Sequence, residues 1–312
     1  MTGLASTVYG VDFASAADTA GKKTWIAKAT VEDGSLSVES CRRLVTERHC
    51  DSGRESAHAA LAEFIREKLD SDSAIGLDFP FGLPEAVLDE QEWGDYITDF
   101  PECLSVPDWS DDDLPNEIDS ADDLSAWGSQ RARENEKADC VHCKRVTDEE
   151  HGAQPPYGII GKSITFHGLK NVIAPLAADD DVTVAPMEVA DFEDPTGPLV
   201  IEAYPAGTLD RLGLCRQGYK GDGDRETRRR CRNLTGLQTA NGSGFDLYSD
   251  DTPIPIVEID DDLKSDLLDD GGGDGLDAIV AAVATYRATR SSNGLKPDIE
   301  EEDYKREGYI YV

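Results

Sequence analysis

The 312-residue sequence predicts an α/β protein built on one mixed β-sheet with helices on both faces. Three observations support this class. Three β-rich segments open the chain, an amphipathic helix separates them from a fourth, and strand and helix patterns return after residue 198. The predicted order is β-β-β-α-β-α-β-α. Hydrophobic residues make up 39% of the chain, enough for a large core, and we expect a single domain over residues 1–312.

The three N-terminal strands are predicted from short apolar or alternating segments. Residues 7–13 form an apolar run with an acid near its end, and residues 22–31 and 35–41 alternate and are rich in β-forming side chains. Asp33 and Gly34 lie between the second and third segments. Because Asp-Gly between alternating segments is a strong hairpin signal, these two strands should pair antiparallel.

The later elements follow from periodicity and from apolar runs bounded by turn residues. Apolar residues at helical spacing predict a helix over residues 54–69. Buried strands are predicted over 73–79 and 198–204, helices over 224–239, 260–268 and 274–289, and a closing strand or docked tail over 307–312. Residues 84–198 lack such patterns, and we expect them to be a long insertion of loops and short helices.

The charge balance is strongly acidic. Sixty-four Asp and Glu residues face 30 Lys and Arg residues, and the net charge is −34. Such a chain repels itself at ordinary ionic strength, whereas in molar salt the Debye length is about 3 Å. Acidic excess with few Lys residues is typical of proteins from halophilic organisms, so most carboxylates, including those in the runs 108–123 and 258–270, should be a solvated surface. Counterion release contributes little in molar salt, so this charge does not exclude a nucleic-acid partner.

Cysteine usage and hydropathy bear on the compartment. Seven scattered Cys residues form no disulfide framework. The first 15 residues contain neither a basic segment nor a long apolar segment, and no run reaches the length of a membrane span. We therefore expect a cytoplasmic protein with no membrane partner.

Acidic residues end three predicted strands. They are Asp12, Asp78 and Glu202, and the predicted helix 274–289 adds a further pair one turn apart on one face. The carboxyl ends of parallel strands meet at one edge of a sheet, where open α/β sheets bind ligands. Each acid has an alternative role as a turn or cap residue, because Asp is common at both positions.

The pair on the last helix is Asp274 and Asp277. Asp274 has the alternative role of N-cap, whereas Asp277 lies inside an apolar, Ala-rich helix, where a lone acid is unfavourable unless it is exposed or coordinated. Carboxylates gathered in one crevice favour Mg²⁺ or Mn²⁺. Two such ions about 4 Å apart would activate the attacking water and stabilise the leaving oxygen in phosphodiester cleavage.

Two other clusters are weaker candidates. Cys140 and Cys143 have the spacing of half a zinc site, but no second close ligand pair follows, and reduced thiols are the favoured interpretation. The basic segment 225–232 predicts phosphate-backbone contacts, with a helix face paired with nearby acids as the alternative. Its candidate substrate-binding residues are Arg225, Arg228 and Arg229, and Lys162 is a further candidate from the segment GKSITFHG.

Several segments, in order, resemble a known family. GVDFASA, GLDFPFGLP, IEAYPAGTLDRLGL, DGLDAIVAA and EGYIYV are similar to the predicted ribonuclease-H-like nuclease family called domain of unknown function 429, and KRVTDEEHGAQPPYG resembles its Arg-x-x-Asp segment. The resemblance implies a ribonuclease-H-like fold with an acidic metal site. It assigns metal binding to five acids and catalysis to all of them except Asp274, namely Asp12, Asp78, Glu202, Asp274 and Asp277.

The leading hypothesis is therefore a metal-dependent phosphodiester hydrolase that acts on nucleic acid. The first alternative is a nucleotide-binding protein related to actin-like ATPases and sugar kinases, because GVDFASA and GLDFPFG resemble the two phosphate-loop strands of that superfamily. The second is a binding protein that keeps the ribonuclease-H-like fold without turnover.

Overall fold

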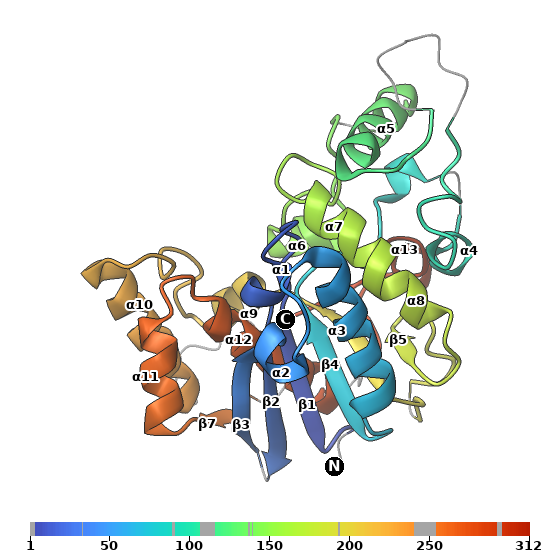
Figure 1. Cartoon of the computed structure of the whole chain (residues 1–312). Coiled ribbons are helices and arrows are strands. Elements are labelled where there is room, and N and C mark those ends of the chain that lie inside the picture. Colours follow the sequence, from blue (N-terminus) through green and yellow to red (C-terminus); the bar gives the residue numbers. More distant parts are fainter. Residues whose placement is uncertain are drawn as a thin grey trace.

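The fold is described from a computed structural model. It describes residues 4–32, 34–88, 91–106, 116–136, 138, 140–192, 194–239, 254–291 and 295–312. Within these residues eight strands form one sheet in the order β5-β6-β4-β1-β2-β3-β7, and β8 also pairs with β6 (Figure 1). The chain is thus an α/β protein with a mixed sheet, as predicted.

The strands combine an antiparallel meander with parallel neighbours. β1 pairs antiparallel with β2 and β2 with β3, whereas β4, β5, β6 and β8 join through parallel pairs, and β7 runs parallel to β3. Their bounds are β1 Thr7–Asp12, β2 Trp25–Glu32, β3 Ser35–Arg43, β4 Ser73–Leu77, β5 Thr183–Ala185, β6 Leu199–Ala203, β7 Ile256–Glu258 and β8 Ile310–Tyr311.

The helices lie on both faces of the sheet and beyond its upper edge in Figure 1, where α3 crosses in front of the strands. Those within or before the insertion are α1 Ala20–Lys23, α2 Leu44–Arg48, α3 Arg54–Lys68, η1 Glu85–Val87, α4 Trp93–Ile97, α5 Ala121–Glu134, α6 Val146–His151, α7 Lys162–Gly168, η2 Leu169–Ile173 and α8 Ala174–Ala177. Those after it are α9 Pro205–Arg211, α10 Asp224–Gln238, α11 Asp261–Asp269, α12 Asp274–Arg290 and α13 Glu301–Glu307.

Most predicted elements are confirmed within a few residues of their ends. The predicted hairpin is present as β2 and β3, although Asp33 itself lies outside the described residues. The predicted strand 22–31 begins late, because Lys22 and Lys23 belong to α1. The insertion differs as well, since it adds β5 to the edge of the sheet beside β6. Residues 108–115, half of the acidic run 108–123, lie outside the described residues.

Close approach between α12 and the sheet depends on two glycines. A Cβ atom at Gly10 of β1 would lie 2.1 Å from the backbone oxygen of Ala278, and one at Gly76 of β4 would lie 2.3 Å from Oγ1 of Thr285. Real Cβ atoms do not approach other atoms so closely. The lack of a side chain at these two glycines therefore allows α12 to pack directly against the backbone of β1 and β4. This contact fixes the start of α12 above the carboxyl ends of β1 and β4.

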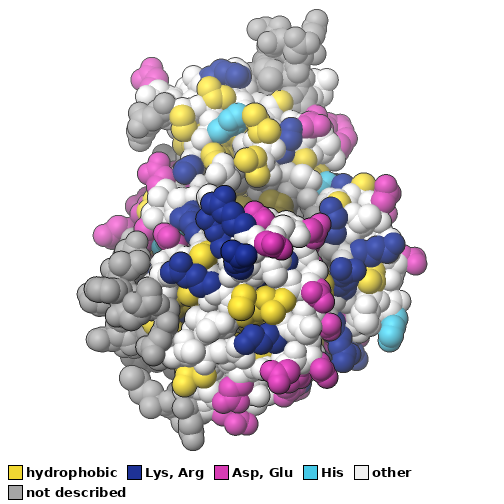
Figure 2. All heavy atoms as spheres, turned by 90° about the vertical axis from the view of Figure 1, so that its left-hand side faces the viewer, with side chains coloured by type: hydrophobic (Ala, Val, Ile, Leu, Met, Phe, Trp, Pro, Cys, Tyr) yellow, Lys and Arg dark blue, Asp and Glu magenta, His cyan; other side chains and the backbone are white. Residues whose placement is uncertain are grey.

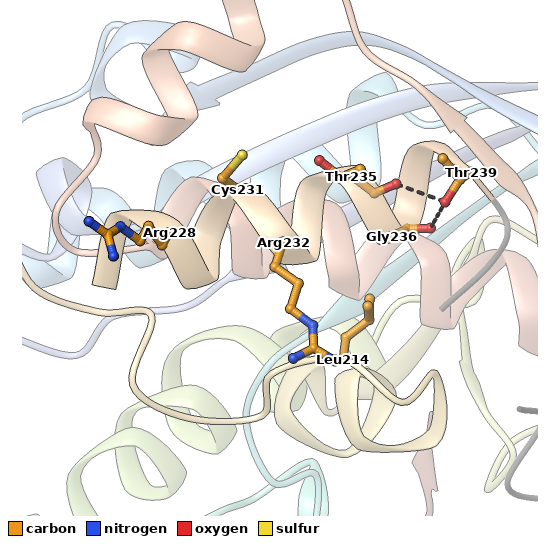
Figure 3. Close-up of a pocket in the computed structure, with 7 residues that line it drawn as sticks. All are labelled: Leu214, Arg228, Cys231, Arg232, Thr235, Gly236 and Thr239. Carbon is orange, nitrogen blue, oxygen red and sulfur yellow. Dashed lines mark hydrogen bonds between the residues drawn. The ribbon is translucent and has the colours of Figure 1, made fainter. Parts of the chain in front are cut away.

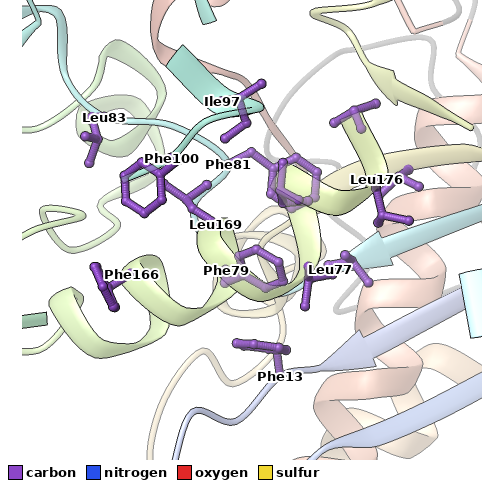
Figure 4. Packing of buried hydrophobic residues seen from close by; sticks show 14 of the residues in the cluster. Phe13, Leu77, Phe79, Phe81, Leu83, Ile97, Phe100, Phe166, Leu169 and Leu176 are labelled. Atoms are coloured by element: carbon purple, nitrogen blue, oxygen red, sulfur yellow. The ribbon is translucent and has the colours of Figure 1, made fainter. Parts of the chain in front are cut away.

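The insertion is held to the opposite face of the sheet by apolar packing. Phe13 follows β1 and Phe79 follows β4, and their ring centroids lie 4.4 Å apart. Figure 4 shows these rings in one buried cluster with Phe166 and Leu169 of the helical run α7-η2 and with further buried side chains from the insertion. Burial of this cluster stabilises the insertion as a cover over the sheet edge where the acidic residues lie.

No helix among the described ranges is long and apolar enough to cross a membrane. The cytoplasmic location stays a prediction.

Candidate active site at the carboxyl edge of the sheet

Two of the predicted acids lie side by side at the ends of neighbouring parallel strands. The register pairs Val11 of β1 with Leu77 of β4, and the Asp78 amide donates to the Val11 carbonyl oxygen at 3.0 Å. Asp12 and Asp78 are the next residues of these two strands, so they lie at the same level of the sheet. Because side chains alternate along a strand, both project toward the face that α12 covers, as Gly10 and Gly76 do.

The start of α12 brings a second pair of acids to this point. Asp277 lies in the first turn of α12 and is 3% exposed, and Asp274 opens the same helix. The positive end of the helix dipole favours carboxylates at these positions. Electrostatic coupling links Asp277 to both Asp12 and Asp78. The structure thus gathers four of the five predicted acids into one group, called here the acid crevice: Asp12, Asp78, Asp274 and Asp277.

A loop that the sequence interpretation did not single out enters the acid crevice. Lys220 Nζ lies 2.7 Å from Oδ2 of Asp277 and 3.6 Å from Oδ1 of Asp274. Tyr219 donates its hydroxyl hydrogen to the other oxygen of Asp277, at 2.7 Å. Both oxygens of Asp277 are therefore engaged by the loop that precedes α10.

A buried arginine holds this loop in place. Arg230 of α10 is 2% exposed, and its Nη1 donates to the carbonyl oxygens of Tyr219 and Gly221 at 2.6 and 2.7 Å. Its Nε and Nη2 donate to the Leu268 carbonyl oxygen. Gly221 also donates its amide hydrogen to the Gly271 carbonyl oxygen, and its φ of 129° is a conformation that only glycine adopts readily. Lys220 is therefore presented by a clamped loop.

The carboxylates of the acid crevice hold their protons more strongly than ordinary ones. Burial raises the pKa of Asp78 to about 8, with a further contribution from Asp277. Burial, then the charge of Asp277, raises the pKa of Asp12 well above its usual range. Burial also lowers the pKa of Lys220, but the charges of Asp277 and Asp12 outweigh it and the net shift is upward. Such coupled shifts are concentrated at functional sites.

Asp12 and Asp78 differ from Asp277 in one respect. Across the residues that the structure describes, no hydrogen bond or ion pair reaches either side-chain carboxylate. Asp12 is nevertheless only 9% exposed. A buried carboxylate without a partner is unfavourable, so Asp12 has the property expected of a ligand-binding group. Asp78 is half-buried and also has no partner among the described residues. The described ranges contain no group of three or more His, Cys, Asp or Glu side chains placed to hold one ion.

Glu202, the fifth predicted acid, is not brought into the acid crevice. The register pairs Glu202 of β6 with Leu77, one residue before Asp78, so its side chain points to the opposite face of the sheet. There it accepts from both terminal nitrogens of Arg145, at 2.5 and 2.7 Å, and from the Phe81 amide at 2.8 Å. At the level of the acid crevice, β6 carries Ala203 instead.

Arg145 and Asp148 form the Arg-x-x-Asp segment, and with Glu202 they make a buried network. Arg145 is 0% exposed and donates to Asp148 through Nε and Nη2, and to the Glu307 carbonyl oxygen at 3.3 Å. All five guanidinium hydrogens have acceptors. The network joins the insertion, β6 and α13, and none of its donors remains free for a ligand.

A cavity of about 370 Å³ lies between this network and the acid crevice. Asp78 and Glu202 both line it, Tyr204 stands at the end of β6, and Ile160 and Ile164 line it from the insertion. Ile160 is 74% exposed and its neighbour Ile159 79%, unusual for large apolar side chains. Ser15 and Ser163 both line the cavity, and their hydroxyls hydrogen-bond at 2.9 Å across the two parts. The insertion therefore supplies one wall of a hollow beside Asp78.

The predicted basic cluster forms an exposed stripe on α10. Arg225, Arg228 and Arg232 are exposed, and within the described ranges none forms an ion pair with a carboxylate. Figure 2 shows Lys and Arg side chains gathered on the face of the molecule that carries α10. Arg229 instead donates to the Gln217 carbonyl oxygen. The alternative of a helix face paired with nearby acids is therefore not what the described residues form.

A groove runs along the same helix. It has a volume of about 430 Å³ and is lined by Arg228, Cys231, Arg232 and other side chains, with Leu214 opposite the helix (Figure 3). Arg232 extends from α10 toward Leu214, whereas Arg228 points away along the helix (Figure 3). The groove reaches Thr239, the residue before the segment 240–253 that lies outside the described residues.

The remaining candidates are engaged elsewhere. Lys162 forms an ion pair with Asp122 of α5, within the insertion. Cys143 donates its thiol hydrogen to the Cys140 carbonyl oxygen at 3.1 Å, and Cys140 donates to the His142 carbonyl oxygen at 3.2 Å. Neither cysteine forms a disulfide bond among the described residues.

The chain matches no protein-family model, no curated protein and no solved structure. The class of protein that the geometry defines is an α/β protein with a buried acid crevice at the carboxyl edge of its sheet.

Proposed function

We propose that the protein is a divalent-metal-dependent phosphodiester hydrolase of the ribonuclease-H-like class, acting on nucleic acid at the acid crevice. The observation that carries the proposal is the pair Asp12 and Asp78. The two residues are adjacent and lie beside Asp277; Asp12 is buried, Asp78 is half-buried, and neither carboxylate has a partner among the described residues. The meander β1-β2-β3, followed by α3 and by β4 and β6 parallel to β1, supports the ribonuclease-H-like assignment, because this is the order that the family resemblance implies.

The carboxylate oxygens of Asp12 and Asp78 are suitable ligands for a divalent ion. Carboxylate oxygens are hard donors, and Mg²⁺ is commonly held by one or two carboxylates together with water and substrate phosphate, without a complete protein cage. Asp12 and Asp78 would hold the ion. When bound, such an ion supplies the positive charge that lowers the pKa of an attacking water and stabilises charge on the phosphate.

The chain's own residues have separate tasks in the proposed hydrolysis. A water oxygen bonds to phosphorus, the bond from phosphorus to the leaving oxygen breaks, and the proton lost by the water ends on the leaving oxygen or in solvent. Asp277 orients Lys220 and Tyr219 toward the crevice through the two contacts at 2.7 Å. Lys220 attracts the phosphate. The apolar cover formed by the insertion restricts water, which strengthens each charge interaction.

The arginine stripe on α10 supports a polyanionic substrate. α10 begins at Asp224, directly after the clamped loop that carries Lys220, so the stripe continues outward from the crevice. Arg225 and Arg232 are seven positions apart, about 10 Å along a helix. Guanidinium groups without carboxylate partners, in a chain of net charge −34, are suited to phosphate oxygens.

The cavity beside Asp78 supports a substrate with an unpaired nucleoside near the scissile phosphate. Its volume lies at the lower end of the range for small-ligand pockets. The carboxylates of its floor, Glu202 and Asp148, outnumber the single cation Arg145, so the cavity repels phosphate. Apolar walls such as Ile164 suit a base. A single strand or a chain end would therefore enter more easily than a continuous duplex.

The test is cleavage of single strands, duplexes, an RNA–DNA hybrid and a branched junction in molar KCl, with Mg²⁺ or Mn²⁺. Wild type is compared with Asp12→Asn and with the control Asp18→Asn, which changes an exposed acid outside the crevice. We expect metal-dependent cleavage by wild type and the control, and a loss of at least about 10³-fold in Asp12→Asn, or some 4 kcal/mol of transition-state stabilisation.

Equal inactivity of all three proteins on every substrate would contradict a nuclease. A sharp rise in melting temperature with ATP would then favour the nucleotide-binding alternative. Absence of stabilisation by both metal and nucleotide would favour a binding protein without turnover.

A further inference from the structure

The acid crevice consists of two halves with different surroundings. The helix half contains Asp274 and Asp277 and is occupied by the ammonium group of Lys220. The strand half contains Asp12 and Asp78, and among the described residues Lys220 forms no ion pair with either. The contrast matters because a two-ion hydrolase needs a cation at each half.

We propose that Lys220 takes the place of a second divalent ion, so that the acid crevice binds one ion and not two. The inference rests on the proposed function and specifies the composition of its site. Lys220 supplies a fixed positive charge at the helix half, and the single ion belongs to the strand half.

Both oxygens of Asp277 already have a partner in this arrangement. Oδ2 faces Lys220 Nζ and Oδ1 accepts from the Tyr219 hydroxyl, both at 2.7 Å, and the residue is 3% exposed. Each oxygen keeps a second lone pair, but a divalent ion bound there would lie beside the Lys220 ammonium, and the repulsion between the two cations opposes binding of both. An ion at the helix half would therefore have to displace Lys220.

The backbone of Lys220 is held more firmly than that of an ordinary surface lysine, although its side chain is 51% exposed. The carbonyl groups on both sides of it, those of Tyr219 and Gly221, accept hydrogen bonds from Arg230. The Gly221 amide is bonded to the Gly271 carbonyl at 2.6 Å, directly before α12. Surface ion pairs are weak because two mobile side chains must be ordered. Here Asp277 is already ordered by burial and the clamp orders the backbone of Lys220, so only the Lys220 side chain remains to be ordered.

The strand half has the opposite character. Asp12 is 9% exposed, lies beside Asp277, and has no hydrogen-bonding partner in the described part of the chain. Its burial without a partner is the independent observation that points to a cation there. Two carboxylates suffice for an ion that takes its remaining ligands from water and phosphate. The described residues offer no group of three or more protein ligands for one ion.

The test is the number of Mn²⁺ ions bound per chain, measured by isothermal titration calorimetry and by electron paramagnetic resonance of free Mn²⁺ in molar KCl. The full chain is compared with Lys220→Met, with Lys220→Arg, and with the control Lys22→Met, an exposed lysine outside the crevice. Metal binding is read without substrate, so the result does not depend on turnover.

We expect one ion in wild type, in Lys22→Met and in Lys220→Arg, and two ions in Lys220→Met. Two ions in wild type would overturn the inference and leave the proposed function standing. One ion in Lys220→Met would also overturn it, provided that circular dichroism shows the variant folded. No ion in wild type would overturn both the inference and the metal requirement of the proposed function.

Discussion

Two buried charge clusters lie on opposite faces of the same sheet edge, and their hydrogen bonding differs completely. In the network of Arg145, Asp148 and Glu202 every guanidinium hydrogen has an acceptor, and two acids share one buried cation. In the acid crevice four carboxylates share Lys220, and Asp12 and Asp78 have no partner within the described residues. A satisfied cluster fixes structure, whereas an unsatisfied one is available for chemistry.

Breaking the satisfied cluster should have the largest effect on stability. Arg145→Met leaves two buried carboxylates without their cation, and we expect the free energy of unfolding to fall by about 3–5 kcal/mol. Urea unfolding in molar KCl measures the change. The control Arg133→Met alters an exposed arginine and should change stability by no more than about 0.5 kcal/mol. A loss below about 1 kcal/mol in Arg145→Met would show that the network is not an anchor.

The packing of α12 against Gly10, which assembles the acid crevice, should have the second largest effect on stability. In Gly10→Ala the new Cβ would lie 2.1 Å from the backbone of α12, so the helix must shift, and we expect a loss of about 1–3 kcal/mol together with weaker Mn²⁺ binding. Gly94→Ala is the matched control, because a Cβ there meets nothing within 4 Å. If Gly10→Ala matches the control in urea unfolding and in Mn²⁺ titration, close helix packing does not build the crevice.

The pH dependence of stability should also distinguish the acid crevice from the arginine network, with a smaller change in the free energy of unfolding. Burial raises the pKa of Asp78 to about 8, so between about pH 4 and 8 the folded chain binds a proton that the unfolded chain releases. This contribution to stability is present at low pH and is lost as the pH rises through 8. We expect Asp78→Asn to be more stable than wild type by about 1–2 kcal/mol at pH 8.5, and by less at pH 5, in EDTA. Asp18→Asn should follow wild type; a constant difference for Asp78→Asn across this range would contradict the assignment.

The arginine stripe should give the smallest effect. Replacing Arg228 and Arg232 by Gln removes two phosphate contacts, and we expect nucleic-acid affinity to fall about 3–10-fold at the lowest salt at which the chain stays folded. Fluorescence anisotropy with a labelled single strand measures it, and the magnitude of the salt slope should fall by about 1.4. The pair Arg66→Gln with Arg133→Gln, on α3 and α5, is the control. Equal affinities for both double variants would exclude α10 from the substrate path.

The sequence predicts most of the sheet and four acids of the crevice because both depend on local patterns. Apolar runs that end in Asp mark Asp12 and Asp78, and the spacing of Asp274 and Asp277 places them on one helix face. Glu202 shows the limit of this reasoning. It also ends an apolar run, but the register of β6 places it one residue earlier, on the other face.

Lys220 and Tyr219 could not be assigned from periodicity, because a loop delivers them. Their segment QGYKGDGD does carry a signal, since glycines flank the two functional side chains and two of these, Gly218 and Gly221, adopt positive φ angles. The buried Arg230 was grouped with its neighbours in the basic cluster, and only its tertiary contacts separate it from the exposed arginines. Register and loop placement are long-range properties that a local pattern does not contain.

The packing of α12 on β1 also has a kinetic consequence. Thr285 donates to the Tyr9 carbonyl oxygen across a sequence separation of 276 residues, and α12 carries Asp277 to Asp12 through the same contact. Contacts of such high order form late and slow folding. During synthesis, β1 must therefore wait for α12 with its α12-facing side uncovered. A nascent chain is thus exposed to misassembly at this surface, and the crevice can become competent only after α12 has been made.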